Sequence, residues 1–140
     1  MIDILPGIQS TSSALNAERI RGDVIAQNIA NSTTTRDAAG HIYQRQEVLF
    51  ESLVLEAGAD GGAAGQNGAQ VSVRIAADSR PPRLSPDPSN PGKMIETPDI
   101  NIHREMTDLI ISQRAYEANL AVAKSAKSMA LQTLAIGKRG

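Results

Sequence analysis

Apolar residues recur with helical spacing at both ends of this chain and alternate with polar ones in its middle. From about Ile4 to Asn31 no proline follows Pro6. Apolar or small residues fall seven apart at Ile8, Leu15, Gly22 and Ile29. This spacing predicts an amphipathic helix, which ends where Asn31 begins a run of Ser and Thr whose side chains compete for backbone hydrogen bonds.

The stretch from Asn101 to Ile136 has the clearest helical pattern, with Pro98 just before it and Gly137 just after it. Asp99 or Asn101 is a suitable N-cap. One apolar seam comprises Ile102, Met106, Leu109, Tyr116, Leu120, Ala123, Ala130 and Leu134. A second seam comprises Ala115, Val122, Met129 and Ile136, again seven apart. Two seams predict more than one helical neighbour.

The middle of the chain predicts short strands joined by irregular connections. Residues 43–55 are rich in Val, Leu and Phe, and Val71, Val73 and Ile75 alternate with polar residues, as in a half-buried strand. Residues 58–68 are rich in Gly and Ala and indicate a loop. Five prolines between Pro81 and Pro91 predict an extended connector.

Composition supports a thin helical fold. Aromatic residues make up only 2% of the 140, although 41% are apolar. Because aromatics supply much of the buried area of a thick core, we expect helix-on-helix packing instead. The predicted fold is mainly α: two long terminal helices packed as a coiled-coil-like pair, with a small irregular β-containing middle segment. The predicted division is a helix over 1–34, a middle segment over 35–100 and a helix over 101–140.

Charge and residue chemistry exclude most catalytic and ligand-binding classes. Fourteen basic residues nearly balance fifteen acidic ones, so no net charge favours nucleic acid or a membrane surface. The chain has no cysteine, and His41 and His103 lack metal-ligand spacing. Neither a nucleophile elbow nor a phosphate-binding loop occurs. We therefore expect no enzyme activity, cofactor, metal, nucleic acid or small-molecule substrate, and no apolar run predicts a membrane span.

The two helices have two possible uses. They could pair only with each other, as an antiparallel helical hairpin in a small monomer, or they could also pack against other subunits. Low aromatic content and the two seams of the C-terminal helix favour the second use. An interface of this kind propagates into a filament or tube when it does not close into a ring.

Three blocks of sequence then carry a resemblance. Residues 28–34 fit the pattern Asn-x-Ala-Asn-x-x-Thr, and Arg114, Tyr116 and Asn119 fit Arg-x-Tyr-x-x-Asn. Both patterns resemble those of flagellar rod, hook and hook-associated proteins. Lys127-Ser128-Met129, the proline-rich middle and the short length resemble the proximal rod proteins within that group.

The resemblance implies a structural subunit of the bacterial flagellar basal-body rod, the drive shaft that transmits torque. It also implies export by the flagellar type III apparatus without a cleaved signal peptide, and a place in the rod within the periplasm. The implied partners are other rod proteins, the membrane-ring protein, the rod-base adaptor, the export apparatus and copies of the chain itself. The alternative is a soluble coiled-coil adaptor or export chaperone of the flagellar system.

The helices also supply candidate assembly residues. Asn28, Asn31 and Thr34 are candidate polar anchors that fix the register of the N-terminal helix, although plain helix capping would also explain them. Tyr116 is a candidate aromatic anchor, and Arg114 is a candidate for charge pairs between subunits. The full predicted set is Ile25, Asn28, Ile29, Asn31, Thr34, Leu109, Arg114, Tyr116, Asn119, Leu120, Met129 and Leu134.

Overall fold

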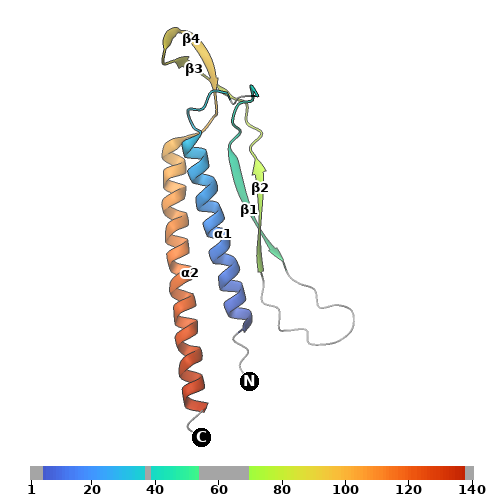
Figure 1. The fold of residues 1–140 in the computed structure, drawn as a ribbon, viewed down its shortest axis with the longest axis vertical. Coiled ribbons are helices and arrows are strands. Elements are labelled where there is room, and N and C mark those ends of the chain that lie inside the picture. Colours follow the sequence, from blue (N-terminus) through green and yellow to red (C-terminus); the bar gives the residue numbers. More distant parts are fainter. Residues whose placement is uncertain (1–4, 37–38, 54–69, 138–140) are drawn as a thin grey trace, which may run out of the picture.

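Two long antiparallel helices and two β-hairpins make up the structure, a computed structural model that describes residues 5–36, 39–53 and 70–137. Helix α1 runs over Leu5–Ala30 and helix α2 over Ile102–Gly137. At 1.5 Å per residue they are about 39 and about 54 Å long. The start of α1 and the end of α2 lie at the same end of the helix pair, which we call the lower end (Figure 1).

Local signals explain where the helices begin and end. The Asn101 side chain accepts a hydrogen bond from the Arg104 N–H at 3.2 Å, which confirms Asn101 as the N-cap of α2. Helix α1 ends at Ala30, where the predicted polar run begins. There the Asn31 amide donates to the Gln27 carbonyl oxygen at 2.8 Å, and the Ser32 hydroxyl donates to the Ile29 carbonyl oxygen.

The first hairpin packs against α1. Strand β1 (Gln46–Leu53) pairs antiparallel with β2 (Gln70–Ala77), with Phe50 opposite Val73. The Arg21 guanidinium lies 5.9 Å from the centre of the Phe50 ring, and the Val71 N–H donates to the Ser13 hydroxyl. The predicted Gly/Ala-rich loop, residues 58–68, lies outside the described residues.

The second hairpin stands at the upper end of the molecule. Strand β3 (Arg83–Asp87) pairs antiparallel with β4 (Asn90–Thr97), and among the described elements these two contact only each other. The proline-rich connector is therefore a hairpin. Proline is tolerated because both strands of a two-stranded sheet are edges, where a missing N–H breaks no essential bond.

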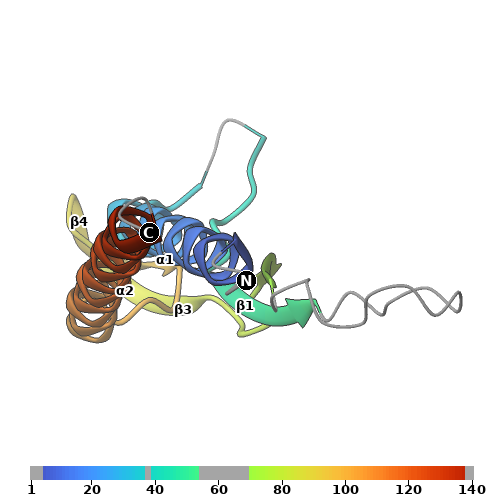
Figure 2. The same cartoon turned by 90° about the horizontal axis from the view of Figure 1, so that it is seen from below.

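The elements form three layers, with α1 in the middle. Figures 1 and 2 show α1 between α2 on one side and the first hairpin on the other. Among the described elements, α1 contacts both neighbours, whereas α2 contacts only α1. One side of α2 is thus covered and the rest of its surface is open.

The predicted fold class is wrong in two respects. Within its described residues the middle segment is not irregular, because four strands form two antiparallel hairpins beside the helices. The helix pair is not coiled-coil-like either. Much of the first predicted seam of α2 is exposed, at Ile102, Met106 and Leu134. The division of the chain into three segments stays a prediction.

The fully buried positions of α2 are polar. They are Glu105 and Ser112. Further along, less exposed positions recur every three or four residues at Ala115, Asn119, Ala123, Ala126 and Ala130. Small residues let two helices approach closely but bury little area. The less exposed side of α2 therefore combines polar residues with alanines, and among its large apolar residues only Leu109 and Leu120 are half-buried.

Candidate assembly site

A polar cluster joins α1, the first hairpin and α2 at the upper end of the molecule. At its centre is Asn28, 0% exposed, on the last turns of α1. Its amide nitrogen donates to the Gln46 carbonyl oxygen at 2.8 Å and to a Glu105 carboxylate oxygen at 3.2 Å. Its oxygen accepts from the Gln46 N–H at 2.9 Å and from the Tyr43 hydroxyl at 3.0 Å. All four hydrogen-bonding positions of this amide are used.

Glu105 is the second member of the polar cluster and is 1% exposed. Its carboxylate pairs with the Arg45 guanidinium at 2.7 Å as well as with the Asn28 amide. A buried carboxylate is stable only when it is paired and hydrogen-bonded, and both conditions are met here. In addition, Glu105 lies in the first turn of α2, where the helix dipole favours negative charge.

The polar cluster continues toward the surface through Asp78 and Arg80. Arg45 lies 3.6 Å from the Asp78 carboxylate, which Arg80 contacts at 2.7 Å. Arg80 also reaches Asp99, just before α2, at 3.4 Å. The side-chain hydrogen bond from Arg80 lowers the pKa of Asp78 and raises that of Arg80. Burial, followed by the nearby Glu105 charge, raises the pKa of Tyr43 and keeps its hydroxyl protonated as a donor.

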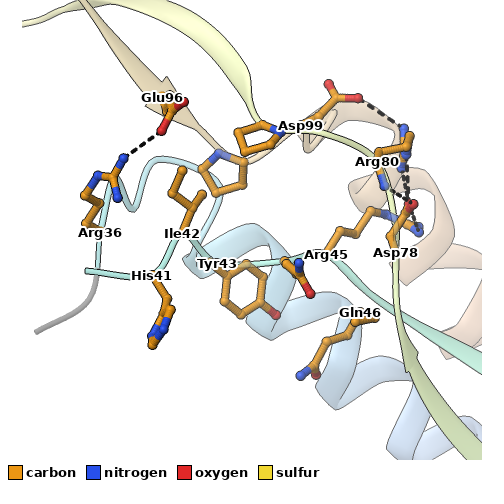
Figure 3. Close-up of a pocket in the computed structure, with 14 residues that line it drawn as sticks. Arg36, His41, Ile42, Tyr43, Arg45, Gln46, Asp78, Arg80, Glu96 and Asp99 are labelled. Atoms are coloured by element: carbon orange, nitrogen blue, oxygen red, sulfur yellow. Dashed lines mark hydrogen bonds and ion pairs between the residues drawn. The ribbon is translucent and has the colours of Figure 1, made fainter. Parts of the chain in front are cut away.

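An open cavity of about 550 Å³ lies above the polar cluster. Figure 3 shows Arg45, Asp78, Arg80 and Asp99 along one rim and Arg36 with Glu96 on the opposite rim. Arg36 contacts Glu96 at 2.7 Å, which links the segment after α1 to the second hairpin. Each arginine of this cavity is paired with a carboxylate. These ion pairs connect segments of the chain, so the arrangement is structural.

The predicted residues on α1 lie at the upper end of that helix. Asn28 and Ile25 are buried, and Ile29 is half-buried. The bonds of Asn28 stay within the chain. Asn31 makes a local hydrogen bond to Gln27, and the Thr34 hydroxyl donates to the Asn31 side chain at 3.3 Å. Local capping therefore explains the contacts of Asn31 and Thr34, whereas Asn28 ties three segments together.

The predicted residues on α2 spread along its whole length. Leu109, Asn119 and Leu120 are half-buried, and Arg114 and Tyr116 are exposed. Met129 and Leu134 are 61% and 71% exposed. The structure does not bring these residues into one site. The second predicted seam, however, lies open at Val122, Met129 and Ile136.

The sequence-based prediction missed the partners of Asn28. Tyr43, Arg45 and Glu105 were not predicted as site residues, although Glu105 could have been suspected as a first-turn acid on an apolar-periodic helix. Ser112 was also missed. It is buried, and its hydroxyl lies 3.1 Å from the carbonyl oxygen and 3.0 Å from the carboxylate of Glu18.

Two classes of site find no support in the described part of the chain. Neither described helix combines the length and apolarity needed to cross a membrane. Among residues 5–36, 39–53 and 70–137, no three His, Asp or Glu side chains gather as metal ligands would.

Comparison with known proteins identifies the family. Residues 8–36 match the family described as flagella basal body rod protein, and residues 92–136 match the C-terminal family of flagellar basal body rod FlgEFG proteins. The chain is 37% identical to the flagellar basal-body rod protein FlgC of Borreliella burgdorferi, over 95% of the chain and 97% of that protein. It is 33% identical to FlgC of Bacillus subtilis, over 91% of the chain and 94% of that protein.

A third relative gives a similar match. The chain is 30% identical to FlgC of Salmonella typhimurium, over 90% of the chain and 92% of that protein. Relatives of this identity and coverage confirm the resemblance seen in the three sequence blocks. The chain belongs to the FlgC family of flagellar basal-body rod proteins and is a structural subunit of the basal-body rod.

Proposed function

We propose that this subunit assembles through the open faces of α2 while the polar cluster holds its own helices and hairpins together. One observation carries the proposal: the residues that α2 buries are the polar Glu105 and Ser112, whereas most of its large apolar residues are exposed. The exposed set is Ile102, Met106, Ile110, Ile111, Tyr116, Val122, Met129, Leu131, Leu134 and Ile136. So many large apolar side chains exposed on a single helix indicate interaction surfaces.

The exposed residues are distributed over more than one side of α2. Ile111, Val122 and Met129 follow one row, whereas Met106 and Ile110 lie on another. Apolar faces on two sides of one element support contacts with two different neighbours. Such heterologous contacts extend into a helical tube when the rotation between copies does not close. Torque is then shared by many small interfaces.

The polar cluster would serve as the joint between this tube and the hairpins. It contains a fully bonded amide and a buried ion pair, whose geometries are specific, so it holds one arrangement of α1, β1 and α2. We propose that Asn28 acts inside the subunit, and that Leu109, Arg114, Tyr116, Asn119, Leu120, Met129 and Leu134 act on or beside its contact surfaces. In this proposal Ile25 and Ile29 support the joint, and Asn31 and Thr34 cap α1.

The partners and place of the subunit are part of the proposal. They are copies of the chain, other rod proteins, the membrane-ring protein and the rod-base adaptor, within the periplasmic part of the basal body. The flagellar type III apparatus would deliver the chain. Family membership supports this assignment, because a basal-body rod subunit must meet other flagellar components.

Charge placed on the open face of α2 tests the proposed function. Met129→Asp and Val122→Asp, at side chains that are 61% and 58% exposed, are expected to abolish swimming and to remove the protein from detergent-extracted basal bodies, because assembly would bury a carboxylate without a partner. Gln132→Asp, an exposed polar position on the same helix, is the matched control. Normal swimming and normal basal bodies in both apolar variants would refute assembly through α2.

A further inference from the structure

An open groove of about 250 Å³ runs along the junction of α1, β1 and α2. Buried Val24 and Ile25 lie at its base, and Val48 and Phe50 line it from β1. Phe50 is the only phenylalanine of the chain and remains 43% exposed. The groove therefore presents apolar side chains to whatever lies beside the molecule, and its volume suits one or two aliphatic side chains.

The unpaired charge of this groove is negative. Of the cations that line it, Arg45 is held by Glu105 and Asp78, and Arg21 lies against Phe50 and Glu18. Two acidic residues also line it, Asp108 from α2 and Glu47 from β1. Within residues 5–36, 39–53 and 70–137, neither makes an ion pair or a side-chain hydrogen bond. A cation at the edge of the groove would satisfy both.

A matching ridge occurs on α2 of the same chain. Ile102, Met106, Ile110 and Arg114 lie four residues apart and are all exposed. Side chains at this spacing form one row on a helix, of the kind that packs into a groove of a neighbour. Arg114 makes no ion pair with any described residue. An apolar row that ends in a cation therefore matches the apolar lining and the unpaired negative charge of the groove.

One copy cannot bring its own ridge into its own groove. Asp108, at the groove, is two residues from both Met106 and Ile110, and residues two apart point about 160° apart around a helix. The ridge therefore faces away from the groove. Groove and ridge are different surfaces of one chain, as a heterologous contact between copies requires.

The geometry points to a second copy of this chain as the occupant of the groove: its ridge packs on Phe50 and Val48, and its Arg114 pairs with Asp108 and Glu47. This inference rests on the proposed function, since it names which surfaces meet when copies stand side by side. Electrostatic pairing at the edge would set the register, and the apolar contact would supply the burial.

Cysteine cross-linking tests this contact directly, because the full chain has no native cysteine. Glu47→Cys and Arg114→Cys chains are mixed at rod-forming concentration and oxidised. A disulfide joining one chain of each kind is expected. Glu47→Cys mixed with Lys124→Cys, an exposed cation further down α2, is the control. Equal yields from both mixtures, or no mixed disulfide with Arg114→Cys, would overturn the inference.

Exchanging the charges provides a second test in cells. Asp108→Arg and Arg114→Asp are each expected to weaken self-association about tenfold and to reduce swimming, because like charges then meet. The double exchange D108R/R114D should restore both. If it does not, or if E117R/R114D restores them instead, another surface faces Arg114 and the inference is wrong. If both single variants swim normally while deletion of the protein abolishes swimming, the contact between groove and ridge is wrong. The proposed function would still stand in that case.

Discussion

The upper and lower ends of the helix pair are held together by different means. At the upper end Asn28, Glu105 and Arg45 form a buried cluster in which each polar group has a partner. Beyond Ser112 no described residue of α2 is buried, and its last turns are open at Leu134 and Ile136, which are 71% and 75% exposed. The same helix is thus specified within the subunit at one end and left open at the other.

This difference shows how a subunit can be folded and still require assembly. A hydrogen-bonded cluster specifies one geometry but adds little net free energy, because its groups were bonded to water before folding. An open apolar face gains free energy only when it is covered. We therefore expect substitutions at the upper end to change the free energy of unfolding of the subunit, and substitutions at the lower end to change assembly.

The largest effect on the subunit is expected from Glu105→Ala. The substitution leaves the Asn28 amide without one acceptor and removes the closest partner of Arg45. Breaking a buried ion pair costs about 3–5 kcal/mol of the free energy of unfolding. Urea unfolding followed by circular dichroism measures it, with the exposed Glu117→Ala as the control. A loss under about 1 kcal/mol would show that the polar cluster does not hold the upper end.

Asn28→Ala is expected to follow, at about 2–3 kcal/mol, because it leaves the Tyr43 hydroxyl and the Gln46 backbone without buried partners. Asn31→Ala is the matched control, since Asn31 makes only local bonds at the surface, to Gln27 and Thr34. Hydrogen exchange at the Gln46 amide gives a local readout. Equal losses in the two variants would remove the distinction between the buried joint and the helix cap.

Gly22→Ala is expected to stabilise the subunit by about 1 kcal/mol. A Cβ at this position would lie 3.9 Å from the Ser112 hydroxyl oxygen, which is ordinary contact distance. The gain in helix propensity therefore meets no clash with α2. The midpoint of urea unfolding should rise. A fall would mean that the two helices lie closer together in solution than in the structure.

Acid should weaken the outer part of the polar cluster. Because Arg80 lowers the pKa of Asp78, the contribution of this carboxylate is complete above its unfolded pKa of about 3.9 and is lost as pH falls through the lower folded value. The natural chain should therefore have a higher free energy of unfolding than Asp78→Asn at neutral pH. This difference should shrink as the pH falls below about 4. A difference that stays constant down to pH 2.5 would contradict the pairing.

The smallest effect on the subunit is expected at its lower end. Met129→Asp should change the free energy of unfolding of the isolated subunit by about 0.5 kcal/mol or less, because this side chain is already in water. The same variant should fail to enter the rod. A large decrease in the free energy of unfolding of the isolated subunit would show that the lower end is also held by contacts within the subunit. The two ends would then not differ in the way described.

Helical spacing and caps predicted both long helices closely. The end of α1 before Asn31 and the N-cap at Asn101 followed from local chemistry alone. The second seam of α2 was also predicted, because apolar positions seven apart can be read from the chain. The hairpin over residues 83–97 was not predicted. Its prolines argue against a strand when only the sequence is considered, and the pairing of the two strands appears only in the structure.

The amino-acid sequence by itself determined the helices, their apolar faces and the family, because each depends on residues close together in the chain or on short motifs of fixed spacing. Only the tertiary structure decided which face of α2 meets α1. Glu105 and Asn28 are 77 residues apart, and nothing local indicates that a glutamate will be buried against an asparagine. Their pairing depends on Arg45 arriving from the first hairpin to balance the charge, and that requires the whole fold.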